Sequence, residues 1–102
     1  MAYTTIDNPE LYFQVKTYIG NGSANHAITL DGDTDLQPDF VWIKNRDATD
    51  SHCLFDSTRG VTKLLSSDDT AVESTDADTL KSWTSDGFTV GADVKVNTSS
   101  EK

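Results

Sequence analysis

Apolar and polar residues alternate along several short stretches of this sequence, and the first stretch is YFQVKTYI, residues 12–19. One side of this stretch carries Phe13, Val15, Thr17 and Ile19, and the other carries two tyrosines, a glutamine and a lysine. Alternation with a period of two is typical of a strand that is buried on one face. We therefore expect a half-buried strand over residues 12–19 and a second strand over HAITL, residues 26–30.

Two apolar stretches separated by a turn follow in the segment 39–56. In DFVWIKNR, Phe40 and Trp42 point one way, and two further apolar residues point the other. Apolar residues on both faces predict a strand that is covered on both sides. DATDS then turns the chain and HCLFD returns, which predicts a hairpin in which Phe40 or Trp42 meets Leu54 or Phe55 across the strands.

The second half of the chain contains further turn and strand signals. DSTRG, residues 56–60, predicts a turn, and VTKLL after it predicts a short strand. The DG pair at 86–87 predicts a hairpin between LKSW and FTVG, while Val94 and Val96 indicate a last strand. Residues 66–79, SSDDTAVESTDADT, contain three apolar residues and predict an exposed acidic loop.

These signals predict an all-β fold of about seven short strands with no long helix. A chain of 102 residues has the length of one domain, so residues 1–102 are expected to form a single antiparallel β-sandwich, for example a jelly roll. An edge-bearing barrel is the alternative. The 14 Asp and 14 Thr residues fit this prediction, because Asp favours turns and Thr tolerates strands.

Composition limits the possible partners. Hydrophobic residues make up 35% of the chain, which predicts a thin core and favours association with copies of itself or with a larger assembly. The net charge of −9 should repel phosphate backbones and anionic lipids, so nucleic acid and membrane surfaces are not expected partners. The N-terminus lacks the pattern of a signal peptide, and no apolar stretch approaches the length of a membrane helix, so synthesis in the cytoplasm is expected.

No pattern in the chain predicts catalysis. Cys53 is the single cysteine, and it follows His52 directly. Neighbouring side chains on a strand point to opposite faces, so these two residues should not form a nucleophile and base pair. We interpret Cys53 as structural and expect neither an enzyme nor a cofactor.

Asp31, Asp33 and Asp35 in DGDTDLQPD are the best candidates for metal ligands, because calcium loops begin with such alternation. Position six of the loop is Leu36 rather than Gly, and position twelve is Trp42 rather than Glu. A solvated acidic turn is the favoured interpretation, and no metal site is assigned.

Trp42 and Trp83 are the candidate ligand-binding residues. Exposed tryptophan rings can stack on sugars. Both residues lie in expected strands with apolar neighbours, so packing in the core or at an interface is favoured over contact with a glycan.

The succession GNGS, LQPDFVWIKNRD, HCLFDSTRG, LLSSD and SDGFTVG followed by VN resembles a domain that recurs in structural proteins of marine and cyanobacterial phages. The resemblance covers residues 18–97, with QPDFVWIK and DGFTVG as its most specific parts. It implies a sandwich of lectin-like or jelly-roll type, located in the virion, with copies of itself and other virion proteins as partners. It carries over no catalytic residues.

Three functions follow as expectations from this resemblance. The first is a tail fibre or other appendage component, the second is a capsid decoration protein, and the third is a receptor-recognition module that binds a host surface glycan. Domains of this kind usually continue after VN into an aromatic strand, whereas this sequence ends with TSSEK. We therefore expect the N-terminal part of a longer virion protein, the alternative being a final strand supplied by another chain.

Overall fold

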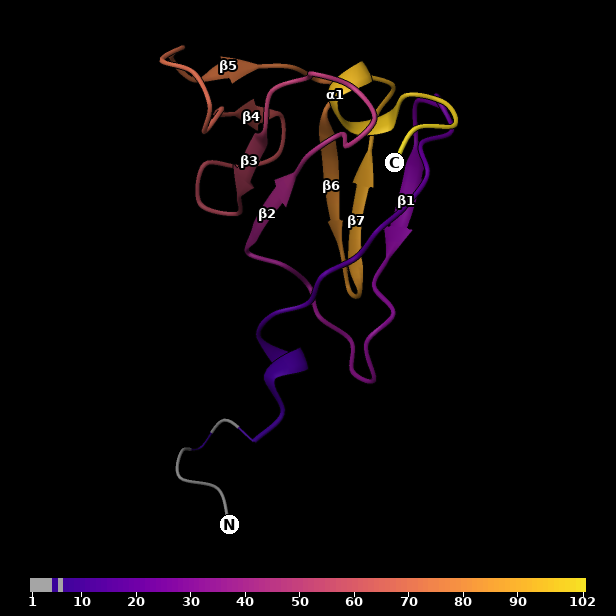
Figure 1. The fold of residues 1–102 in the computed structure, drawn as a ribbon. Helices are drawn as coiled ribbons and strands as arrows, with labels where there is room; N and C mark the ends of the chain where they lie inside the picture. The colour runs from indigo at the N-terminus through magenta and orange to yellow at the C-terminus, as the bar shows by residue number, and fades with distance from the viewer. Residues whose placement is uncertain (1–4, 6) are drawn as a thin grey trace.

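Seven short strands, one 3₁₀ turn and one short helix make up the fold in a computed structural model that describes residues 5 and 7–102. Figure 1 shows their arrangement. In chain order the elements are η1 (Pro9–Leu11), β1 (His26–Thr29), β2 (Phe40–Ile43), β3 (Cys53–Asp56), β4 (Lys63–Leu64), β5 (Ser74–Thr75), β6 (Leu80–Thr84), β7 (Gly87–Val90) and α1 (Val94–Asn97). The all-β class with small antiparallel sheets and no long helix is confirmed. Within the described residues, no helix is long and apolar enough to cross a membrane.

The first layer is a three-stranded antiparallel sheet in the order β1-β7-β6. Its β6–β7 hairpin turns at the DG pair, as the sequence predicts. Gly87 lies at φ +144°, and a Cβ there would approach the carbonyl oxygen of Ile28 to 2.0 Å. Only glycine satisfies both the backbone conformation and this close approach of β1.

The second layer is built around the β2–β3 hairpin. Trp42 lies opposite Leu54, so the expected meeting of the two strands is confirmed. On the other side of β3, Leu54 forms an antiparallel bridge with Leu65, the residue directly after β4, and β4 pairs with β5. The strands of this layer therefore follow the order β2-β3-β4-β5, with β2 at one edge and β5 at the other.

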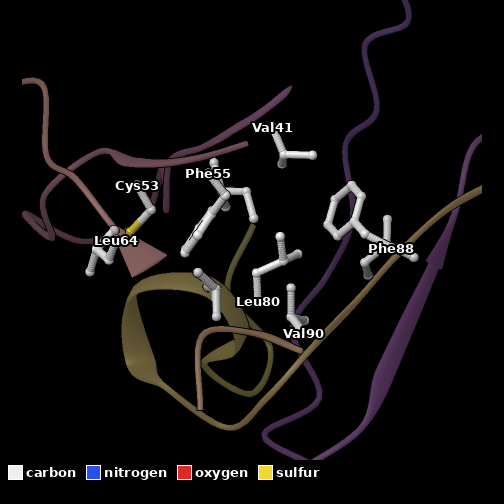
Figure 2. Close-up of a cluster of buried hydrophobic side chains, with 10 residues drawn as sticks. Val41, Cys53, Phe55, Leu64, Leu80, Phe88 and Val90 are labelled. Atoms are coloured by element: carbon white, nitrogen blue, oxygen red, sulfur yellow. The ribbon is translucent and has the colours of Figure 1, made fainter. Parts of the chain in front are cut away.

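The hydrophobic core lies between the two layers. Figure 2 shows Val41 and Phe55 of the second layer facing Leu80, Phe88 and Val90 of the first. Alternation explains this arrangement, because every second residue of β2 and β3 is buried. Phe55 is fully buried and lies among residues of both layers, so it joins them.

The prediction that β2 is covered on both sides is wrong. Phe40 and Trp42 are 57% and 59% exposed, and β2 pairs only with β3 in the described part of the chain. The outer face of β2 is apolar, as the pattern indicates, but no described element covers it. The pattern therefore identified an exposed apolar surface and not a second covering layer.

The prediction of a strand over residues 12–19 is also wrong. This segment leads from η1 towards β1 without pairing with any described strand. It is fixed by side-chain contacts, because the Gln14 amide donates to the carbonyl oxygens of Glu10 and Thr34 and the Tyr18 hydroxyl donates to that of Val96. Alternation describes side chains only, and a strand also needs a neighbouring backbone.

The last expected strand is instead the short helix α1. Asp93 caps its N-terminus, since its carboxylate accepts a hydrogen bond from the backbone N–H of Lys95 at 2.8 Å. Val96 is buried and Val94 is exposed, so the two valines do not share a face. The acidic loop is exposed over residues 67–75 as expected, but it contains the small strand β5.

Replacement of Phe55 by Ala tests the joining role of this residue. Removing a fully buried phenylalanine should lower the free energy of unfolding by about 3–5 kcal/mol, because lost burial and a residual cavity both contribute. Urea denaturation monitored by circular dichroism measures this loss. The matched control, Phe40→Ala, removes a mostly exposed ring and should change stability by less than about 0.5 kcal/mol. Equal losses in the two variants would contradict the assignment of faces.

Candidate interaction site beside the edge of the second layer

A groove with a volume of about 640 Å³ lies beside β2. Residues 11–18 form one wall, residues 36–46 form the other, and core residues such as Phe88 also line it. This volume is in the range of about 300–1,000 Å³ that ligand sites occupy. The groove exists because the segment 11–18 lies near the second layer without pairing with it.

Backbone groups of β2 face away from β3 at this edge. The backbone N–H of Ser57 donates to the carbonyl oxygen of Asp39 at 2.8 Å, so Asp39 bonds towards β3. In an antiparallel pair such bonds alternate, which directs the N–H and C=O groups of Phe40 and Trp42 to the free edge. An unpaired edge of this kind is a template for another strand.

The groove is basic although the protein is acidic. Five of the eight Lys and Arg residues of the chain line it, compared with two of the 17 Asp and Glu residues. These residues are Lys16, Lys44, Arg46, Lys95 and Lys102 on the one hand, and Asp39 and Glu101 on the other. Residues 1–4 and 6 carry no charged side chain, so both counts cover every charged side chain of the sequence. Lys16 and Lys95 form ion pairs with aspartates, whereas Lys44 and Arg46 form none with any described residue.

Trp42 and Trp83 occupy different environments. The Trp42 indole N–H donates to Nδ1 of His52 at 2.8 Å, and the two rings meet edge to face with centroids 5.6 Å apart. This bond uses Nδ1 of His52 as an acceptor and holds the exposed indole ring in place. Trp83 is partly buried and packs against the core.

Cys53 is fully buried, and its thiol donates to the carbonyl oxygen of Ser51 at 3.6 Å. Burial raises the pKa of this thiol to about 12, so it is protonated at neutral pH. His52 bonds to Trp42 and His26 bonds to Asn97, so both imidazoles have other partners. The structural interpretation of Cys53 agrees with this geometry.

The aspartates of the candidate metal loop do not converge. Asp31 forms an ion pair with Lys16 at 2.8 Å, which lowers the pKa of its carboxyl group. The backbone N–H of Asp33 donates to the Glu10 carboxylate at 2.6 Å. Among residues 5 and 7–102, no group of three or more His, Cys, Asp or Glu side chains is arranged to hold a metal ion, so Asp35 belongs to no such group either.

The sequence did not reveal a buried polar cluster centred on Asn97. Its side-chain oxygen accepts from the backbone N–H of Asn21 and bonds to Nδ1 of His26, at 2.9 and 2.8 Å. Its amide donates to Asn21 Oδ1 and to the carbonyl oxygens of Ser23 and Gly91. Asn97 therefore ties the GNGS turn to the end of β7. The one hint of its importance in the sequence was that it belongs to VN, a segment of the resemblance to phage structural proteins.

Arg59 fixes the position of the acidic loop. Its guanidinium bonds to the carboxylates of Asp56 and Glu73 and to the carbonyl oxygens of Leu54 and Lys63. The backbone N–H and side chain of Arg59 lower the pKa of the Asp56 carboxyl group. The expected DSTRG turn is confirmed, since the backbone N–H of Gly60 donates to the carbonyl oxygen of Asp56.

Two layers of short antiparallel strands with an open basic groove at one edge define a small β-rich domain. The chain belongs to the family described as domain of unknown function DUF7483, whose sequence profile matches residues 8–102. Comparison with curated proteins and with solved structures gave no significant match.

The raised pKa of Cys53 predicts slow reaction with Ellman's reagent. At pH 8 the native thiol should react more than about 100-fold more slowly than the thiol in urea, because the thiolate is the reactive form and an exposed cysteine has a pKa of about 8.5. Since folding raises this pKa, the stability contributed by the neutral thiol is present below about pH 8.5 and is lost as the pH rises towards 12. Rapid labelling of the native protein at pH 8 would show that Cys53 is accessible.

Replacement of Asn97 by Ala should destabilise the fold. The carbonyl oxygens of Ser23 and Gly91 and the ring of His26 lose a partner, and the expected loss is about 2–4 kcal/mol in the free energy of unfolding. Urea denaturation measures it. Asn8→Ala is the matched control, because Asn8 only caps the short turn η1, and a loss below about 1 kcal/mol is expected there. A loss for Asn97→Ala as small as the loss for Asn8→Ala would show that the polar cluster contributes little to stability.

Proposed function

We propose that this protein is a structural component of a bacteriophage virion that acts by packing and not by catalysis. A tail fibre or other appendage is the first placement, and a capsid decoration protein is the second within the same proposal. Its partners are copies of itself and other virion proteins.

The observation that carries the proposal is the apolar surface around the groove. Phe13 and Val15 on one wall are 72% and 75% exposed, and Phe40 and Trp42 on the other are more than half exposed. Several large apolar side chains exposed around one groove are typical of sites that contact other proteins. Beside it, β2 offers unpaired backbone groups, so the same region supplies both apolar contact and hydrogen bonds.

The virion placement is supported by the resemblance of the recurring segments. QPDFVWIK contributes β2 and a wall of the groove, and DGFTVG forms β7 and the turn before it. GNGS and VN meet in the polar cluster around Asn97. The segments that carry the resemblance thus build the sheets and the exposed edge, which are the parts a packing function requires.

A carbohydrate-binding module is the second candidate, and the environment of Trp42 favours it. The ring is more than half exposed and is held by His52, which leaves a ring face oriented in advance for stacking on a sugar. In this alternative the partner is a host surface glycan, and Trp42→Ala abolishes the binding.

The native mass of the purified protein tests the two candidates. At micromolar concentration, light scattering after size exclusion should give a mass of at least twice the 11.1 kDa of one chain, because the exposed apolar surface is buried in contacts between copies. A clean monomer at all concentrations would contradict self-packing. A monomer that is retained on an immobilised glycan through Trp42 would support the carbohydrate-binding module in its place.

A further inference from the structure

We propose that copies of this protein associate head to tail, with the acidic loop and β5 edge of one copy, residues 66–75, docked in the basic groove beside β2 of the next copy. The inference rests on the proposed packing function and names the two surfaces that would perform it.

Strand order places these two surfaces at opposite ends of one layer. The second layer runs β2-β3-β4-β5, so its free edges belong to β2 and β5. Figure 1 likewise shows β5 on the far side of β3 from β2. Because the edges belong to different strands, β5 of one copy can continue the sheet at β2 of the next.

Charge makes the pairing specific. Residues 66–75 contain three acidic residues and no Lys or Arg. Glu73 pairs with Arg59 of the same copy, whereas Asp68 and Asp69 form no ion pair with any described residue. The groove is the region where most cations of the chain collect, and Lys44 and Arg46 there have no acidic partner among the described residues. Opposite potentials on two surfaces of one chain favour contact between copies over contact between like surfaces.

The loop also presents an apolar side chain and free backbone. Val72 is 87% exposed, and it is the most exposed of the large hydrophobic side chains that the structure describes. Residues 70–73 precede β5 and belong to no strand, and they match β2 in length. Within this segment the backbone N–H of Ala71 donates to the Asp69 carboxylate at 2.8 Å, and pairing with β2 would replace that bond or leave it on the outer edge. In the docked arrangement Val72 enters the basic groove, whose lining includes Phe13 and Phe40.

This contact joins two different surfaces and is therefore heterologous. Repetition of such a contact gives a closed ring or an open filament, depending on the rotation between neighbours. Arg59 holds Glu73 at 3.0 Å within each copy, so the loop is anchored at one end while Val72 remains exposed.

Two variants separate the two surfaces. Val72→Asp places a charge at the apolar contact of the loop, and the double variant Lys44→Glu with Arg46→Glu reverses the charge of the groove. Each should weaken self-association at least about tenfold in sedimentation velocity, while Lys81→Glu, outside the groove, should stay within about twofold. Urea denaturation verifies that each variant is folded. If the groove variant is unstable, Val72→Asp still tests the proposal, because Val72 lies on an exposed loop where a substitution should not unfold the protein.

Mixing the two variants tests the head-to-tail arrangement. Val72→Asp retains an intact groove and the double variant retains an intact loop, so the mixture should form one-to-one dimers and nothing larger. Absence of these dimers, with the wild type assembling, would overturn the proposal.

The remaining outcomes separate this inference from the proposed function. Wild-type assembly that none of the variants weakens leaves the packing function standing and overturns this pair of surfaces. Assembly lost with the groove variant but kept with Val72→Asp shows that another segment of the second copy occupies the groove, which also overturns it. A monomeric wild type overturns the inference and the self-packing part of the proposed function.

Discussion

The incomplete covering of β2 is the constraint on which the remaining features depend. Its inner face, with Val41 and Ile43, is buried against the first layer. Its outer face and one edge are left without a described neighbour. A strand in the middle of a sheet has a partner on each edge, whereas β2 has one. Its paired edge and inner face stabilise the domain, and its other edge and outer face are available to a partner. Together with residues 11–18, this uncovered face and edge of β2 border the groove.

The two ends of the chain shape the groove from opposite directions. The segment after η1 provides one wall, and it is held by Gln14 and Tyr18 and not by strand pairing. Near the C-terminus, the backbone N–H of Lys102 donates to the carboxylate of Asp47, and the backbone N–H of Arg46 donates to the carbonyl oxygen of Lys102. The Asn97 cluster fixes both regions to the first layer. A groove bordered by such contacts is preformed, which lowers the entropic cost of binding a partner strand.

Sequence patterns predicted well the features that depend on neighbouring residues. The β2–β3 hairpin, the turn before Gly87, the turn at Arg59 and the exposed acidic loop each follow from local turn chemistry and alternation. The burial of Cys53 follows from its place on a strand facing the core. A few consecutive residues determine each of these features, so they can be predicted without knowledge of the rest of the chain.

The patterns failed where the result depends on distant segments. YFQVKTYI alternates as a strand does, but a strand also requires pairing with a second backbone, and none of the described strands pairs with this segment. Val94 and Val96 fit a strand or a helix, and the cap at Asp93 decides for the helix. The basic groove could not be predicted because its cations come from positions as far apart as Lys16 and Lys102. Jelly-roll or lectin-like topology remains a prediction.

Amide hydrogen exchange in dilute, monomeric protein tests the central claim, the open edge of β2, most directly. The N–H groups of Val41 and Ile43 face β3 and should exchange slowly, whereas those of Phe40 and Trp42 face the open edge and should exchange at least about tenfold faster. Among these four amides, raising the protein concentration should then slow exchange only at Phe40 and Trp42. Equal protection of all four amides in the monomer would show that the edge is already paired and would contradict the account.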